Sequence, residues 1–203
     1  MKNKDLNYFE IIIDNDLDED IVRNSLIREI KNIKIHDSTF ENCIFKNINF
    51  SDVLFDGVDF VNVIFENCDL SNKVFNERLI KKVNFKNCKL SGTSFVESSL
   101  YDVNFDGCNL NFSNFASSKL KNILFNDVNI MESTFYDCKL KNITLENVDF
   151  TKSEIFNTSL NDIDFTHSII TNVRFDLKSV KGMIIDSFQL VYLANLLEVK
   201  LKD

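Results

Sequence analysis

The residues best suited to chemistry in this 203-residue chain are five cysteines and two histidines. Cys68, Cys88 and Cys108 are spaced 20 residues apart, so a structure with that period would stack their thiols. Stacked thiols could form a disulfide or bind a soft metal ion, but metal sites use closely spaced cysteine pairs, and none occurs. Nothing pairs His36 with His167, and no phosphate loop or nucleophile elbow is present. The sequence therefore predicts buried, reduced cysteines, no metal or other cofactor, and no enzyme.

A row of large apolar residues must position these groups. It occupies every fifth position from Phe40 to Ile185 without exception, and a second row of small or β-branched residues lies two positions earlier and holds all five cysteines. Neither the period of an α-helix nor that of a β-strand produces such a row. Residues two apart in an extended segment point to the same side, so each unit sends one large and one small side chain inward. The pattern predicts a solenoid whose units pack on their neighbours.

A longer period sets the number of units in each coil. Asn, Asp and Gly, which tolerate the left-handed backbone of a corner, predominate two positions after the row and recur every 20 residues, as at Asn47, Asn67 and Asn87. This recurrence predicts four units per coil and a square cross-section. We number the faces by their first row residues: face 1 begins at Phe40, face 2 at Phe45, face 3 at Phe50 and face 4 at Phe55.

The units STFEN, CIFKN and INFSD, and the run CKLSGTSFVESSLYDVNFDGCNLNF, resemble pentapeptide repeats. The resemblance implies an all-β fold, a right-handed quadrilateral parallel β-helix, here followed by a C-terminal α-helical cap. The segments NCKLSGTSFVESSLYDVNFDGC and FNTSLNDIDFT and the ending VKGMIIDSFQLVYLANLLEVKL are similar to the quinolone-resistance (Qnr-type) pentapeptide proteins of Gram-positive bacteria. That likeness implies a non-enzymatic DNA mimic that binds DNA gyrase or topoisomerase IV and protects it from fluoroquinolones or a toxin.

The two ends of the chain depart from the repeat. Residues 1–35 are predicted to form an irregular N-terminal cap, in which residues 16–32 fit either a short helix capped by Asp18 or degenerate coils. Residues 36–185 form the β-helix, and residues 186–203 form a C-terminal module with a helix over 186–197 that starts at Asp186 or Ser187. The family resemblance implies that this module makes a symmetric homodimer. The candidate dimerisation residues are Phe188, Tyr192, Leu193, Leu196 and Val199.

Net charge and hydropathy bound the partners and the compartment. A formal net charge of −8 argues against direct nucleic-acid binding, which needs a basic surface. No segment approaches the roughly 20 apolar residues of a membrane span. The N-terminal segment has acidic residues within its apolar part and no cleavage site, so we expect a cytoplasmic protein without a signal peptide.

Carboxylates gather on faces 2 and 4, which lie opposite each other, while lysines make face 1 basic. A rod lined with carboxylates can imitate duplex DNA, although a basic face would repel a DNA-binding surface. Charged faces also keep a solenoid soluble, and the sequence leaves both interpretations open. The candidate partner-binding carboxylates are Glu66, Glu97, Asp106, Asp127, Asp137, Glu146, Glu154 and Asp164.

An apolar stripe supports an alternative function. Val96, Ala116, Tyr136 and Phe156 recur every 20 residues one position after the row on face 4, so they are predicted to point outward. Such a stripe suits a protein-interaction scaffold with an unrelated partner, or it reflects packing between neighbouring turns.

Two cations interrupt the small inward row. Lys73 and Arg78 occupy positions where a buried, unpaired cation would be costly, so the segment 72–82 is predicted to be irregular. It fits either a local repacking with outward charges or a protruding contact loop.

Overall fold

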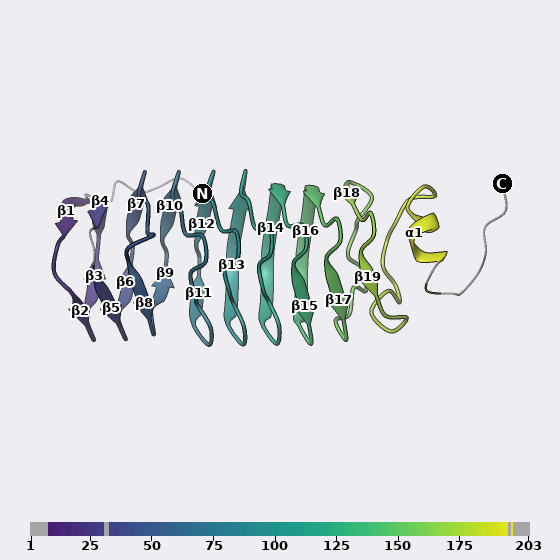
Figure 1. Ribbon diagram of the computed structural model, residues 1–203, viewed down its shortest axis with the longest axis horizontal. Coiled ribbons are helices and arrows are strands. Elements are labelled where there is room, and N and C mark those ends of the chain that lie inside the picture. The colour runs from purple at the N-terminus through teal and green to yellow at the C-terminus, as the bar shows by residue number, and fades with distance from the viewer. Residues whose placement is uncertain (1–7, 31–32, 195, 197–203) are drawn as a thin grey trace.

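The computed structural model describes residues 8–30, 33–194 and 196. Figure 1 shows a rod of stacked coils that runs from β1 at one end to α1 at the other. The predicted fold class is confirmed, because the chain forms an all-β parallel solenoid of about eight turns with one short C-terminal helix. Each strand pairs with the strand that follows it by one coil, and every pairing is parallel.

The strands fall into three sheets that run along the rod. The strands of the largest sheet, on faces 1 and 2, are β1 (Phe9–Ile13), β3 (Ile21–Arg23), β4 (Ser25–Ile30), β6 (Thr39–Glu41), β7 (Ile44–Lys46), β9 (Asp59–Val61), β10 (Ile64–Glu66), β11 (Leu79–Lys81), β12 (Asn84–Lys86), β13 (Ser99–Asp106), β14 (Lys119–Asn129), β16 (Lys139–Asp149) and β18 (Ser168–Ile169). Face 4 holds two short sheets, with β2 (Leu17–Asp18), β5 (Lys34–His36) and β8 (Leu54–Asp56) in one and β15 (Thr134–Tyr136), β17 (Glu154–Phe156) and β19 (Arg174–Phe175) in the other. Face 3 is built mostly of turns joined by isolated bridges, such as Asp69 to Lys89.

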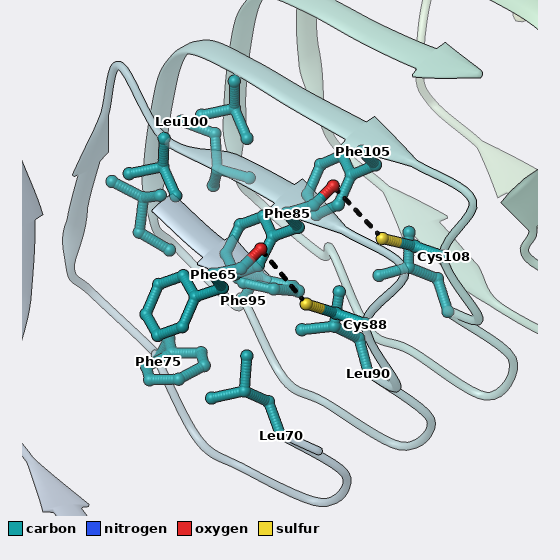
Figure 2. Packing of buried hydrophobic residues seen from close by; sticks show 14 of the residues in the cluster. Phe65, Leu70, Phe75, Phe85, Cys88, Leu90, Phe95, Leu100, Phe105 and Cys108 are labelled. Atoms are coloured by element: carbon teal, nitrogen blue, oxygen red, sulfur yellow. Dashed lines mark hydrogen bonds between the residues drawn. The ribbon is translucent and has the colours of Figure 1, made fainter. Parts of the chain in front are cut away.

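The five-residue row forms the core. On face 2 the rings of Phe65, Phe85 and Phe105 stack directly, with centroids 5.0 and 5.1 Å apart. Figure 2 shows the adjoining small row, in which Cys88 and Cys108 donate to the Phe65 and Phe85 carbonyls. Each small side chain thus satisfies a backbone acceptor of the preceding coil, and each large one fills the interior.

Asparagines at the corners adopt the left-handed backbone that the pattern predicts. Asn42 and Asn62 have φ of 53° and 55°, and the Asn62 side-chain amide donates to the Asn42 side-chain oxygen at 2.7 Å. A short amide side chain tolerates this conformation and stacks on its equivalent one coil away. The same residue type therefore both turns the corner and links the coils.

The predicted N-terminal cap needs correction, because residues 9–30 already form coils rather than an irregular cap or a helix. Phe9 pairs with Ser25, a separation of 16 residues, and Ile21 pairs with Thr39, a separation of 18. From Lys34, which pairs with Leu54, the separation becomes 20. Shorter coils shift the apolar residues out of the five-residue phase, which explains why the sequence pattern is lost there.

The C-terminal helix is shorter than predicted. Helix α1 spans Leu190–Ala194, after a turn in which the Asp186 carboxylate accepts the Phe188 and Gln189 amides at 2.8 Å. The buried Gln189 side chain donates to the carbonyls of Phe165 and Ser168, and this contact fastens the turn to the last complete coil. Predicted residues Leu197 and Val199 lie outside the described residues.

The hydrogen-bonded ladder between coils is interrupted first on face 4. Among the described residues, no backbone hydrogen bond joins 53–57 to 73–77, although Leu54 bonds to the preceding coil and Ser94 bonds to Lys73 in the following one. The Lys73 ammonium turns back and donates to the Ser51 carbonyl at 3.2 Å and the Val53 carbonyl at 2.9 Å. We name this interruption the Lys73 break.

The second interruption lies on faces 1 and 2 after β16. In the described part of the chain, no backbone hydrogen bond joins 139–146 to 159–166. The equivalent bonds exist in earlier coils, for example from the Asn62 amide to the Lys81 carbonyl at 2.8 Å. We name this interruption the β16 break. At both breaks a strand is followed by a coil segment in turn geometry, at β8 in the first and at β16 in the second.

Candidate interaction surfaces

The predicted acidic surfaces lie on opposite sides of the rod, but their carboxylates differ in availability. Glu66 forms an ion pair with Lys46 at 2.8 Å, and Glu154 pairs with Arg174. Both of these carboxylates are half-buried and already neutralised by a cation one coil away. The other six candidates are exposed and have no ion pair within the described residues: Glu97, Asp106, Asp127, Asp137, Glu146 and Asp164.

Some of these six carboxylates contribute to the corner ladders. Asp106 and Asp127 accept the side-chain amides of Asn126 and Asn147 at 2.8 and 2.7 Å. Glu97 and Asp137 occupy the face 4 corner with φ of 58° and 56° and point outward. Glu97 and Asp137 therefore combine exposure with the absence of a described cationic partner, which makes them the most available charges of face 4.

The apolar stripe of face 4 is half-buried rather than freely exposed. Tyr136 and Phe156 contact each other edge to face, with centroids 5.3 Å apart, and the Arg174 guanidinium lies 5.7 Å from the centre of the Phe156 ring. The Tyr136 hydroxyl donates to Glu154, and this hydrogen bond raises the pKa of Tyr136 above its ordinary value. Val96 is also half-buried. The stripe thus packs between neighbouring coils and borders a groove of about 350 Å³ that reaches Tyr192.

The C-terminal dimerisation candidates divide into two sets. Phe188 is 85% exposed and Tyr192 is partly exposed, so both are free to meet another surface. Leu193 and Leu196 instead pack against the solenoid core. The predicted face of five residues is therefore only partly available, because two of its leucines cover the end of the rod.

The irregular corner keeps its place in the coil. Lys73 closes the ladder from within, and Arg78 donates to the Asn76 carbonyl at 3.2 Å. Burial lowers the pKa of Lys73, while Asp52 and Asp69 oppose that shift. Neither a loop nor an insertion projects from the described segment 72–82.

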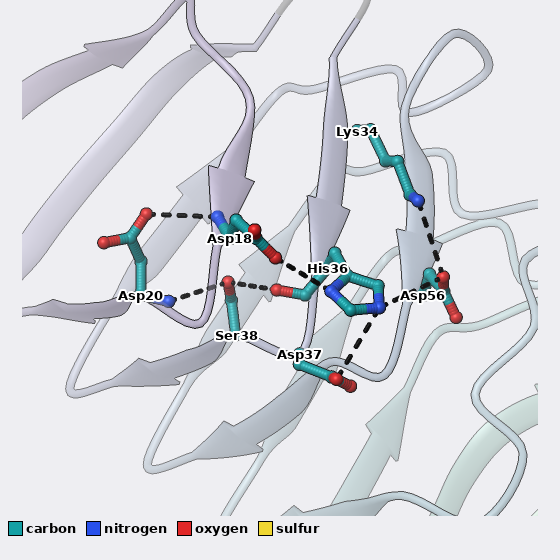
Figure 3. Close-up of polar contacts among 7 residues, drawn as sticks. All are labelled: Asp18, Asp20, Lys34, His36, Asp37, Ser38 and Asp56. Atoms are coloured by element: carbon teal, nitrogen blue, oxygen red, sulfur yellow. Dashed lines mark hydrogen bonds and ion pairs between the residues drawn. The ribbon is translucent and has the colours of Figure 1, made fainter.

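A polar cluster near the N-terminal end was not anticipated from the sequence. Figure 3 shows His36 between Asp18 and Asp56, with its Nδ1 2.8 Å from Asp18 and its Nε2 3.7 Å from Asp56. The hydrogen bond to Asp18 raises the pKa of His36 above 6.5, and the charges of Asp37 and Asp56 add to that shift. Its signal was hidden because Asp18 and His36 are neighbours only in the shorter 18-residue coils.

The cysteines occupy the buried small row. All five are free, and burial raises the pKa of the Cys43 and Cys138 thiols. Among the described residues no group of His, Cys, Asp and Glu is arranged to hold a metal ion. In the same residues no helix is long and apolar enough to cross a membrane. These thiols pack as small apolar side chains that also donate to carbonyls.

Comparison with known families follows the coils. A family model described as a pentapeptide repeat region matches residues 58–135, and another described as pentapeptide repeats in eight copies matches residues 35–72. The chain belongs to the pentapeptide repeat family. No curated protein sequence matches it significantly.

Solved structures of pentapeptide repeat proteins share the fold. HetL, involved in heterocyst differentiation regulation in the cyanobacterium Nostoc sp. strain PCC 7120, is 11% identical, with a TM-score of 0.54 and 90% of each chain covered. A trypsin-treated form of QnrB1, a plasmid-mediated fluoroquinolone resistance protein, is 18% identical, with a TM-score of 0.41, covering 97% of this chain and 100% of that one. At these identities the likeness shows the fold of this pentapeptide repeat protein and not its partner.

Proposed function

We propose that this pentapeptide repeat protein is a non-enzymatic binding protein whose acidic rod occupies a surface that otherwise receives duplex DNA. The observation that carries the proposal is the set of six exposed carboxylates without ion pairs on opposite faces. Duplex DNA presents a negative charge about every 1.7 Å of its axis, and a stiff rod with repeated carboxylates offers a coarser version of that pattern. Coils that repeat with the spacing of sheet strands hold these charges in fixed register.

The partner class we propose is a type II topoisomerase, either DNA gyrase or topoisomerase IV. The sequence resemblance to Qnr-type proteins motivates this choice, with protection from fluoroquinolones or a toxin as the consequence. Such a partner places the protein in the cytoplasm. The basic face 1 would point away from the bound enzyme, because only faces 2 and 4 carry the required charge.

A supercoiling assay tests the proposal. Gyrase from a Gram-positive bacterium is titrated with the protein, with and without ciprofloxacin. The expected result is restored supercoiling in the presence of the drug, and its loss in the double variant Glu97→Lys/Asp137→Lys. The matched control is Asp69→Lys/Glu132→Lys, which reverses two carboxylates of face 3 that are already paired with Lys89 and Lys152. No binding and no effect on either reaction would reject a topoisomerase as the partner.

A second candidate function is a protein-interaction scaffold that uses the apolar stripe. The groove beside Phe156 and Tyr192 supports it, because the stripe continues into that groove. Changing Tyr136 and Phe156 to Ser separates the two candidates. Electrostatic mimicry should survive this change and weaken as salt rises, whereas an apolar scaffold should show the reverse.

We also propose a homodimer through the C-terminal module. The exposed Phe188 and Tyr192 support it, since large exposed apolar side chains at the end of a rod favour contact with a second copy. Light scattering after size exclusion should give twice the monomer mass, and Phe188→Ser should give the monomer. A monomeric mass for the unchanged protein would reject the dimer.

A further inference from the structure

The β16 break opens a groove in the side of the rod. The groove has a volume of about 620 Å³ and lies on face 1 at its corner with face 4. Lys139 and Leu140 of β16 form one wall, residues 157–161 form the floor, and Lys178 and Lys181 form the other wall. Ligand-binding clefts of proteins commonly have volumes of about 300–1,000 Å³.

The edge of β16 that faces this groove is unpaired. In the described part of the chain, the Asn142 amide has no hydrogen-bond partner, whereas the equivalent Asn62 amide donates to Lys81. Leu140 and Ile143 are partly exposed, while Leu120 and Ile123, their equivalents one coil earlier, are each 1% exposed. An unpaired strand edge is a template for another strand, because it presents free N–H and C=O groups at regular intervals.

A small apolar void lies behind this edge. It has a volume of about 20 Å³ and is lined by side chains from both sides of the break, among them Leu140, Leu145 and Leu160. The stack of rings on face 2 ends at Phe125, because the next residue in the row is Leu145. The loss of one ring therefore leaves space at the place where the ladder is open.

The lysines around the groove lack carboxylate partners. In β14 and β16, Lys119 pairs with Lys139 and Lys121 with Lys141 across neighbouring strands. Like charges placed opposite each other destabilise a sheet. None of these four, nor Lys178 or Lys181, has an ion pair within the described residues.

Elsewhere on the rod, cations stack on carboxylates one coil away, as Lys46 does on Glu66 and Lys152 on Glu132. The lysines of face 1 thus form a positive surface that the chain itself leaves unbalanced.

We propose that this β16 groove binds an extended acidic segment of another protein, which adds as a strand to the free edge of β16. Alternate side chains of such a strand would point outward beside Lys139 and Lys141 and inward beside Leu140. Carboxylates suit the first positions and small apolar side chains suit the second. A nucleic acid would match the charge but has no peptide N–H and C=O groups with which to complete the ladder.

This site is separate from the proposed topoisomerase-binding surface. The acidic surfaces use faces 2 and 4, whereas the groove uses the lysines of face 1. The supercoiling assay can therefore fail while the groove binds its peptide, and the reverse also holds.

The experiment uses a fluorescein-labelled peptide of sequence EVEVEVE and the full-length protein, with binding measured by fluorescence anisotropy. The expected result is saturable binding that falls about tenfold or more in Lys139→Glu/Lys181→Glu, because two charged contacts are reversed. The matched control, Lys89→Glu/Lys152→Glu, makes the same charge change at ion-paired lysines and should stay within about twofold.

Two further measurements separate strand addition from charge attraction alone. The same peptide with N-methylated valines should bind about tenfold more weakly, since it cannot complete the ladder. Hydrogen exchange at the Asn142 amide should slow when the unmodified peptide is bound. A KVKVKVK peptide should not bind.

Several outcomes would overturn the proposal. Absence of binding at millimolar peptide, or equal loss in both charge variants, would show that the groove is not the site. Equal binding of the N-methylated peptide without protection of Asn142 would leave only a charge contact. Stronger binding of a thymidine oligonucleotide, at the same lysines, would identify nucleic acid as the partner class instead.

Discussion

The Lys73 break and the β16 break interrupt the same ladder in different ways. At the first, an ammonium from the following coil reaches the Ser51 and Val53 carbonyls, and the row stays filled, with the rings of Phe55 and Phe75 5.4 Å apart. At the second, in the described residues, no side chain occupies the open edge at Asn142, and an apolar void lies behind it. One break is closed by groups of the chain itself, and the other is left accessible.

The difference indicates what a solenoid needs in order to tolerate an irregular coil. Unpaired backbone groups must find another partner, and the inward row must still fill the interior. The Lys73 break meets both conditions within one face. The β16 break extends over two faces and meets neither, so the remaining hydrogen bonds on faces 3 and 4, such as that from Phe150 to Ile169, hold the last coils in place.

The largest expected effect compares equivalent leucines before and at the β16 break. Leu120→Ala should lower the free energy of unfolding by about 3 kcal/mol, because it removes a fully buried side chain. Leu140→Ala, at a partly exposed position, should lower it by roughly half as much. Urea unfolding measures both values. Equal losses would mean that Leu140 is as well packed as Leu120 and that the break is closed in solution.

The second prediction removes the group that closes the Lys73 break. Lys73→Met should lower the free energy of unfolding by about 1–2 kcal/mol, because the Ser51 and Val53 carbonyls lose their donor. Lys89→Met is the control, since that exposed lysine pairs with Asp69 only at 3.8 Å and should change stability by less than about 0.5 kcal/mol. A neutral or stabilising Lys73→Met would contradict the role assigned to the ammonium.

The third prediction fills the void at the β16 break. Leu145→Phe continues the stack of rings beyond Phe125 and should raise the free energy of unfolding by about 0.5–1 kcal/mol. The same substitution at Leu120, where the core is already closed, should be destabilising through overpacking. Thermal unfolding of the two variants checks the comparison. If Leu145→Phe destabilises the protein, the void is too small or too rigid to accept a ring.

The smallest effect concerns the strand that borders the Lys73 break from the N-terminal side. Asp56 of β8 faces His36, whose pKa is raised, chiefly by Asp18. A raised pKa stabilises the folded state fully below pH 6.5 and loses that contribution as the pH rises through the folded value. The difference in melting temperature between the wild type and His36→Gln should therefore shrink from pH 5.5 to 8.5. A difference independent of pH would mean that His36 acts by packing alone.

The predictability of the surfaces differed from that of the core. Glu66 and Glu154 were expected to be available, yet each lies beside a cation one coil away, Lys46 and Arg174, which the sorting by face did not pair. Leu193 and Leu196 were expected at a dimer contact but cover the end of the rod. Side chains at the same height of neighbouring coils compete for one another, and this competition depends on rotamers that a periodic pattern does not contain.

The sequence by itself determined the repeat, the inward rows, the corners and the number of units in each coil, because a single five-residue period satisfies packing and turn geometry at once. Tertiary structure alone decided where the period fails to bring neighbouring coils together. The coils of 16 and 18 residues near Phe9, the ammonium of Lys73 between two carbonyls and the free edge of β16 all depend on the register between coils. Register is a property of two segments about 20 residues apart, and the pattern within one segment does not specify it.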